Sequence, residues 1–167
     1  MNLPVHVLIL CTGNSARSIL SEAILNHIGS GRFLAMSAGS HPTGKVNPLA
    51  LSVLEEQDME TAGFRSKSWD EFTGENAPPI DLVITVCDNA AGETCPVWSG
   101  QPIKIHWGLP DPAAVEGDHS QRLAAFRETF DTLTRRMERM TALPIETLSP
   151  SALKDALEAI AEGELPA

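Results

Sequence analysis

The sequence has no tyrosine. It also has only three cysteines and few basic residues, and each of these two shortages argues against a class of protein. Three cysteines are too few, and an odd number, for the disulfide framework of a small secreted protein. With 12 Lys and Arg against 22 Asp and Glu, the net charge is −10, which argues against nucleic-acid binding. No apolar run is long enough to span a bilayer, and the first residues lack the pattern of a secretory signal. We therefore expect a cytoplasmic protein that binds neither nucleic acid nor a membrane.

Segments typical of strands and helices alternate along the chain, which is the pattern of an α/β fold. Apolar runs predict strands at 5–10, 33–37, 80–86 and 103–105. Apolar spacing and capping residues predict helices at 19–28, 48–59, 118–140 and 150–163, with a short helix at 69–72. Strands separated by helices form a parallel sheet, and ligands bind beyond the carboxyl ends of its strands. Cys11, Ser37 and Cys87 all fall at that edge.

The run Cys-Thr-Gly-Asn-Ser-Ala-Arg-Ser, residues 11–18, joins the first strand to the first helix. The backbone N–H groups of such a turn and the positive end of the helix dipole together bind an oxyanion. Because the chain as a whole is acidic, the attraction for an anion must be local. We expect the binding site to consist of Thr12, Gly13, Asn14, Ser15, Ala16, Arg17 and Ser18.

Two residues of this loop have the chemistry of a catalyst. The thiolate of Cys11 is a nucleophile, and N–H dipoles with a nearby cation lower the pKa of a cysteine. Arg17 offers a planar fork that can hold two oxygens of a tetrahedral anion. Gly13 allows close approach to the ligand, Asn14 accommodates a left-handed backbone, and we expect Ser18 to donate to the Cys11 sulfur. The alternative, a buried structural cysteine near an ordinary surface arginine, does not account for this combination of residues.

This loop resembles the phosphate loop of low-molecular-weight protein tyrosine phosphatases and, more closely, that of arsenate reductases built on the same fold. The resemblance covers roughly residues 4–140. It implies a four-stranded parallel sheet with helices on both faces, in a domain of residues 1–142. We expect residues 143–167 to be a C-terminal extension with one short helix, because they have no counterpart in the family pattern. The chain departs from the family at Ala16, where phosphatases and some reductases have a second cysteine.

The other two cysteines, Cys87 and Cys95, flank a segment of small and polar residues that follows the third strand. The two thiols can pair with each other, or Cys87 can reach Cys11; the bland alternative is an inert, buried Cys87 and an unimportant Cys95. A zinc site is a poor interpretation, because histidines at ligand spacing are missing. The segment and the following His-Trp-Gly stretch at 106–108 resemble the three-cysteine, thioredoxin-coupled arsenate reductases, although one extra residue separates the cysteines here.

Asp111 precedes Pro112 in a turn-rich segment. A carboxyl group near a bound oxyanion can protonate a departing oxygen, but an aspartate before proline is also a common turn residue. The resemblance resolves these alternatives, since Asp111 matches the general acid of the phosphatases and reductases.

The resemblance implies reduction of arsenate to arsenite, and hence a role in arsenic resistance. Cys11 would attack arsenate held by the loop and Arg17, and Asp111 would protonate the departing oxygen. Cys87 and then Cys95 would carry the resulting disulfide, which thioredoxin, or glutaredoxin with glutathione, would reduce. Phosphate or sulfate would compete for the loop. No metal or organic cofactor is expected.

Two other functions remain open at this stage. A phosphatase that forms a Cys11 phospho-enzyme would use the same loop, but tyrosine phosphatases of the family place an aromatic pair where this chain has Ala113 and Ala114. A non-catalytic oxyanion sensor is the other, but it would need neither the nucleophile Cys11 nor the acid Asp111. The presence of both residues in this chain therefore argues against a sensor.

Three residues match positions that hold a potassium ion in some reductases of the family, namely Asn14, Glu22 and Ser37. The remaining carboxylate of that site is not matched at Trp69, although Asp70 stands beside it. We therefore assign no metal site, and the sequence leaves open whether a potassium ion binds.

Overall fold

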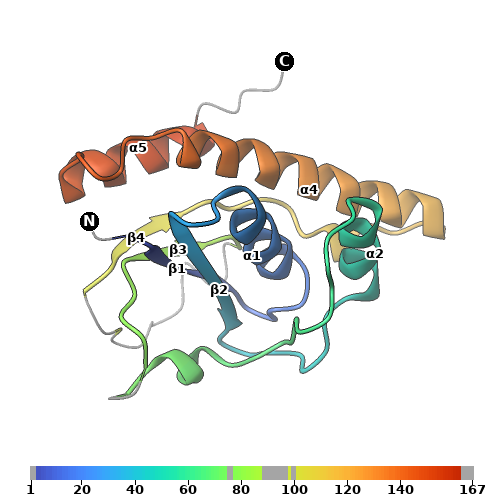
Figure 1. Cartoon of the computed structure of the whole chain (residues 1–167). Helices are drawn as coiled ribbons and strands as arrows, with labels where there is room; N and C mark the ends of the chain where they lie inside the picture. Colours follow the sequence, from blue (N-terminus) through green and yellow to red (C-terminus); the bar gives the residue numbers. More distant parts are fainter. Residues whose placement is uncertain (1–2, 75–76, 88–97, 99–100, 163–167) are drawn as a thin grey trace.

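The computed structural model describes residues 3–74, 77–87, 98 and 101–162 of the chain. They form the predicted four-stranded parallel sheet, in the order β2-β1-β3-β4 (Figure 1). The strands are β1 (Val5–Cys11), β2 (Phe33–Gly39), β3 (Leu82–Thr85) and β4 (Ile103–His106). Because all four run in one direction, their carboxyl ends meet at a single edge of the sheet.

The side chains of β1 divide between two apolar layers, since successive residues of a strand point to opposite faces. Val7 and Ile9 join a large core beneath the long helices. Leu8 and Leu10 join a smaller cluster on the opposite face, which includes Trp98. Burial on both faces explains why β1 is an unbroken apolar run rather than an alternating one.

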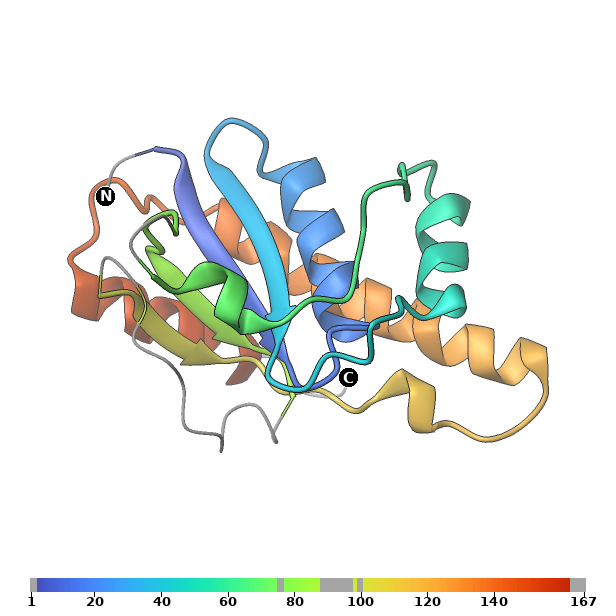
Figure 2. The same cartoon turned by 90° about the horizontal axis from the view of Figure 1, so that it is seen from below.

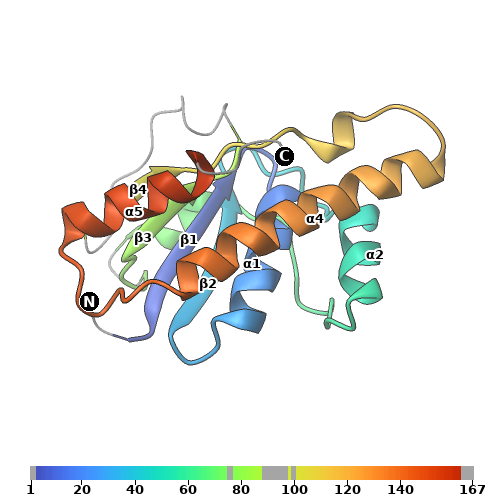
Figure 3. The same cartoon turned by 90° about the horizontal axis from the view of Figure 1, so that it is seen from above.

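Helices cover both faces of the sheet, as predicted, but the two layers differ in thickness. One face carries α1 (Arg17–Ile28), α4 (His119–Thr141) and α5 (Pro150–Glu162), with α2 (Pro48–Glu56) packed on α1 and α4 (Figures 1 and 3). On the other face, the described part of the chain contributes the 3-10 helix η1 (Trp69–Phe72), seen in green in Figure 2. Phe72 of η1 packs in the smaller apolar cluster.

Two predicted elements are longer than the observed ones. Helix α2 ends at Glu56 rather than near residue 59, because Asp58 adopts a left-handed conformation (φ 57°) that turns the chain. Strand β3 comprises four residues, although Ile80 and Val86 on either side of it are fully buried. These flanking residues are apolar because they are buried, and their apolar character made the sequence resemble a longer strand.

The long helix α4 begins where its cap predicts. The Asp118 side chain accepts from the N–H of Gln121, whose side chain accepts in return from the N–H of Asp118. The stripe predicted to face the core is buried except for the partly exposed Leu123, and it comprises Phe126, Phe130, Leu133, Met137 and Met140.

The C-terminal helix α5 is part of the main core rather than an appendage. Its buried residues Leu153, Leu157 and Ile160 belong to the same cluster as β1 and α4. The fully buried Trp107 donates from Nε1 to the Leu157 carbonyl (2.8 Å), which fixes α5 against the segment that follows β4. No helix formed by the described residues is both long and apolar enough to cross a membrane.

Candidate active site

The loop at residues 11–16 lies at the carboxyl edge of the sheet, between the end of β1 and the start of α1. Its carbonyls at Thr12, Gly13 and Ser15 accept hydrogen bonds of 2.9–3.0 Å from the backbone N–H groups of His41, Thr43 and Asn47. In a trans peptide the N–H points opposite to the carbonyl. The N–H groups that follow these carbonyls therefore point away from segment 41–47, and that of Gly13 is hydrogen-bonded to Cys11, which is compatible with an anion cradle.

Asn14 is the residue that shapes the loop. It is fully buried with a φ of 46°, the left-handed conformation expected of it. Its Nδ2 donates to Ser18 Oγ (2.8 Å) and Ser37 Oγ (3.0 Å), and its Oδ1 accepts from the backbone N–H of Lys67 (2.9 Å). All the hydrogen-bonding capacity of this buried amide other than one lone pair is used, so the loop is held in a single conformation.

The Ser18 hydroxyl was expected to donate to the Cys11 sulfur. In the described part of the chain, the hydrogen bond found for this hydroxyl is the one it accepts from Asn14. Ser18 therefore supports the loop through Asn14.

Cys11 and Cys87 lie together as thiols, both buried, at the ends of neighbouring strands. The two side chains are hydrogen-bonded to each other. The Cys87 sulfur also accepts from the N–H of Thr12 (3.3 Å), and the Thr12 hydroxyl lies 3.5 Å from it. The backbone N–H of Gly13 is hydrogen-bonded to Cys11 in the same way. Each sulfur thus accepts from one backbone N–H of the loop.

The hydrogen bond with Cys87 raises the pKa of Cys11, and burial raises it further, while the Arg17 charge and the Gly13 N–H oppose the shift. Two sulfurs that share a hydrogen bond lose their protons in two steps. The raised pKa belongs to the second step, because a thiolate on one sulfur disfavours a thiolate on the other. The pair therefore carries at most one negative charge at neutral pH.

Arg17 and Asp111 complete the rim of the site. Arg17 Nη1 donates to the carbonyl of Leu109 (3.0 Å), and its Nη2 lies 3.8 Å from Asp111 Oδ2. The other carboxylate oxygen of Asp111 accepts from the N–H of Ala113 (2.9 Å) and caps the 3-10 helix η2 (Pro112–Ala114). The segment that carries the carboxylate, residues 107–114, is called the acid loop below.

These residues enclose a pocket of about 240 Å³, with the thiol pair at its base. It is lined by Cys11, Thr12, Gly13, Ser15, Ala16, Arg17, Thr43, Cys87, Asp111 and Ala113. The structure thus brings together the predicted nucleophile, anion loop, arginine, acid and second cysteine. Asn14 and Ser18 lie behind the pocket, and Cys95 lies outside the described residues.

Behind the loop, an ammonium group accompanies the three residues that match the potassium site of the family. Ser37 donates to Glu22 Oε1 (2.7 Å), and Lys67 Nζ lies 3.8 Å from the same oxygen. Burial lowers the pKa of Lys67, and the charge of Glu22 opposes that shift. Lys67 therefore offers Glu22 a cation that belongs to the chain itself.

Two residues of the site were not recognised from the sequence as contributing to it. Thr43 forms one wall of the pocket. Gly39 lies against the loop so closely that a Cβ on it would overlap the Thr12 carbonyl oxygen and would lie 2.9 Å from that of Cys11. A glycine just after a strand was a signal of close backbone approach.

Comparison with known proteins agrees with this geometry. The family model of the low molecular weight phosphotyrosine protein phosphatases matches residues 6–151. The chain belongs to that family. It is 33% identical over 129 residues to an arsenate reductase of Halalkalibacterium halodurans, an alignment that covers 77% of this chain and 89% of the relative. The resemblance to the arsenate reductases of the family is thereby confirmed.

Solved structures of family members show the same fold. One, described as an arsenate reductase in the phosphate binding state, has a TM-score of 0.67 and 28% identity, over 83% of this chain and 97% of its own. The thioredoxin-dependent arsenate reductase of Corynebacterium glutamicum has a TM-score of 0.55 and 25% identity, over 83% of this chain and 64% of its own. Both similarities support the fold described above.

Proposed function

We propose that this protein reduces arsenate to arsenite, with electrons supplied by its own thiols. The observation that carries the proposal is the hydrogen-bonded pair of Cys11 and Cys87 at the base of the anion pocket. Ester hydrolysis through a cysteine intermediate needs one thiol, whereas reduction of arsenate by the protein's own thiols needs two that can reach each other. The names of the related proteins, arsenate reductases from several bacteria, support the same substrate.

In the first step, the Cys11 sulfur attacks the arsenic of an arsenate held by the loop N–H groups and Arg17. The Arg17 charge and the Gly13 N–H favour the thiolate of Cys11, and the form of the pair that reacts is the one with Cys11 as the thiolate and the remaining proton on Cys87. A sulfur–arsenic bond forms, an arsenic–oxygen bond breaks, and Asp111 protonates the oxygen so that it leaves as water. Asp111 suits this role because Oδ1 is fixed by the Ala113 N–H while Oδ2 faces Arg17 and the anion.

In the second step, Cys87 attacks the Cys11 sulfur. Once Cys11 is bonded to arsenic, the N–H and hydroxyl of Thr12 favour the thiolate of Cys87. A Cys11–Cys87 disulfide forms and the sulfur–arsenic bond breaks. Its electron pair remains on arsenic, which departs as arsenite, so the two thiols have supplied the two electrons.

Cys95 then attacks Cys87, which frees Cys11 and leaves a Cys87–Cys95 disulfide for an external dithiol to reduce. Thioredoxin is the donor that the Corynebacterium glutamicum relative supports by its description. No step of this sequence requires a metal or an organic cofactor, and in the described residues no cluster of three metal-ligating side chains is present.

The lining of the pocket favours a small inorganic anion over a phosphotyrosine side chain. Among the described residues that line the pocket, none is aromatic. Outside the loop, the two cysteines, Arg17 and Asp111, the lining residues are Thr43 and Ala113. Slow hydrolysis of small phosphate esters is still expected, because the nucleophile and the anion cradle serve phosphate and arsenate alike.

The deciding experiment follows arsenate-dependent oxidation of NADPH with thioredoxin and its reductase, and in parallel with glutathione and glutaredoxin. Cys11→Ser and Cys87→Ser should abolish turnover, whereas Cys95→Ser should release at most one arsenite per chain. Phosphate release from a small aryl phosphate by Cys87→Ser serves as the control for an intact loop. Continued cycling of arsenate by Cys87→Ser would refute the proposal.

A further inference from the structure

Three consecutive backbone carbonyls of the acid loop are held by two arginines from two helices. Arg136 of α4 donates to the carbonyls of Trp107 (Nη1, 2.7 Å) and Gly108 (Nη2, 3.3 Å). Arg17 of α1 donates to the next carbonyl, that of Leu109. The root of the acid loop is therefore fixed from α4 on one side, and it fixes the guanidinium of Arg17 on the other.

Arg136 is unusual for an arginine because it is only 5% exposed. A buried guanidinium is stable only when its N–H groups are paired, and its hydrogen bonds to carbonyls are stronger than those between neutral groups. Removing Arg136 would also leave the Trp107 carbonyl, which is buried with it, without this donor. The substitution therefore releases the loop root rather than merely deleting a surface charge.

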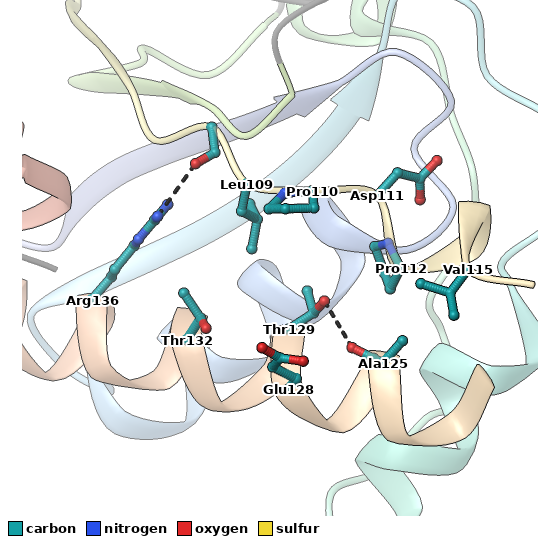
Figure 4. A pocket seen from close by; sticks show the side chains of 11 residues that line it. Leu109, Pro110, Asp111, Pro112, Val115, Ala125, Glu128, Thr129, Thr132 and Arg136 are labelled. Atoms are coloured by element: carbon teal, nitrogen blue, oxygen red, sulfur yellow. Dashed lines mark hydrogen bonds between the residues drawn. The ribbon is translucent and has the colours of Figure 1, made fainter. Parts of the chain in front are cut away.

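Between its root and its far end, where η2 contacts α4, the acid loop has a hollow beneath it. A pocket of about 220 Å³ separates residues 108–112 and 115 from the face of α4 that carries Ala125, Glu128, Thr129 and Thr132 (Figure 4). Figure 4 shows Arg136 reaching the loop at one end of this space, while the Asp111 carboxylate points away from it. With a hollow under this part of the loop, the hydrogen bonds at its root fix the place of Leu109, and together with the contact of η2 on α4 they fix that of Asp111.

We propose that Arg136 is a positioning residue of the active site, which sets the orientation of Arg17 and the place of Asp111 through the acid loop. Arg136 lines the hollow beneath the acid loop and is not among the residues that line the pocket of the two sulfurs. It acts because Arg17 takes its orientation from the Leu109 carbonyl, one residue beyond the two carbonyls that Arg136 holds. The inference about turnover rests on the proposed arsenate reduction, whereas the inference about anion binding does not.

Arg139 provides a matched control. It lies on the same helix, three residues further on, and donates to the Ile160 carbonyl of α5 (3.5 Å), away from the acid loop. Arg136→Met and Arg139→Met each remove one guanidinium from α4, the first with its hydrogen bonds to two carbonyls of the acid loop and the second with its hydrogen bond to one carbonyl of α5. Arg136→Lys keeps the charge but cannot hold two carbonyls in a planar fork.

The test measures how well phosphate protects Cys11 from alkylation by iodoacetamide, with Cys95→Ser and Cys87→Ser as the common background. Arg136→Met should raise the phosphate concentration for half protection by about tenfold, with each variant compared with its own alkylation rate in the absence of phosphate. Arg136→Lys should fall between Arg136→Met and the parent, and Arg139→Met should match the parent. Equal protection in Arg136→Met and Arg139→Met would overturn the inference.

In the otherwise native protein, arsenate turnover separates positioning from simple destabilisation. Arg136→Met should lower kcat by about tenfold as well as raise KM, because Asp111 is displaced together with Arg17. If thermal unfolding shows that Arg136→Met is not folded, Arg136→Lys is the variant that decides. A kcat and a half-protecting phosphate concentration equal to those of the parent in Arg136→Lys would then refute the inference. A chain that does not reduce arsenate but loses phosphate protection in Arg136→Met would refute the proposed function and leave the positioning role standing.

Discussion

The ammonium group of Lys67 lies 3.8 Å from Glu22 Oε1, and Glu22 accepts from Ser37, which in turn accepts from Asn14 of the anion loop. A carboxylate that is largely buried needs a neighbouring positive charge. In some reductases of the family the corresponding residues hold a potassium ion. Here a lysine of the chain fills that electrostatic role beside the loop.

The first prediction is that turnover does not depend on potassium. Exchanging KCl for NaCl at constant ionic strength should leave kcat and KM unchanged, because Lys67 already balances Glu22. Lys67→Met should weaken phosphate protection of Cys11, while Lys45→Met, on an exposed neighbouring segment, should not. Since burial lowers the pKa of Lys67, this support should also be lost at a lower pH than an exposed lysine would lose its charge. A potassium requirement in the parent protein would contradict this view.

The second prediction concerns Gly39 and the close approach of β2 to the loop. A Cβ at this position would overlap the Thr12 carbonyl and approach Asn14 N to 3.0 Å, both rigid backbone atoms. Gly39→Ala should therefore lower the free energy of unfolding by about 2 kcal/mol and abolish phosphate protection of Cys11. Urea unfolding measures the first effect, and Ser40→Ala is the neighbouring control. Normal phosphate binding by Gly39→Ala would show that the loop can move aside.

The third prediction follows from the raised pKa of Cys11. In a Cys95→Ser background, absorbance at 240 nm should report only one thiolate from the Cys11–Cys87 pair as the pH rises to 9. The second proton is held because Cys87 and burial raise the pKa of Cys11, so the second thiolate forms only at higher pH. Cys87→Ala should remove this effect, so that Cys11 is the single titrating group. Two thiolates in the pair at neutral pH would contradict the shared proton.

The fourth prediction separates the two roles of Asp111, proton donor and helix cap. Asp111→Asn keeps a side-chain oxygen to accept from the Ala113 N–H but cannot donate a proton as a carboxylic acid does. The kcat for arsenate should fall about 100-fold with unchanged thermal stability. Phosphate should bind at least as well, because a carboxylate near the anion is gone. Asp118→Asn, which alters the cap of α4, is the control, and equal kcat losses in both variants would refute the acid role.

Sequence reasoning was most successful where the evidence is local. The strand, loop and helix around Cys11 and Arg17 are contiguous, and the positive φ of Asn14 follows from its residue type. The shared sheet edge of Cys11 and Cys87 followed from the parallel direction of the strands, whereas the pairing of β1 with β3, which makes their ends neighbours, was not predicted.

Sequence reasoning was weakest where a side chain acts on a distant segment. Lys67 reaches Glu22 from a connector with no pattern of its own, and Ser18 binds Asn14 because the loop turns that way. From the sequence, Arg136 was interpreted as one of the charged residues on the solvent-facing side of α4. Nothing in the neighbouring residues reveals that the carbonyls of Trp107 and Gly108 lie against it. Such contacts depend on packing between elements, which spacing along the chain does not record.

The last helix also has a consequence for the outer strand of the sheet. Lys154 of α5 donates from Nζ to the Lys104 carbonyl of β4 (2.7 Å), so part of the exposed ladder of that edge is already occupied. An uncovered edge strand is a template for pairing with foreign chains. A chain truncated before α5 would expose both this edge and the apolar surface that Leu153 and Leu157 cover. We therefore expect truncation to cause aggregation, although the residues of the active site would all remain in the chain.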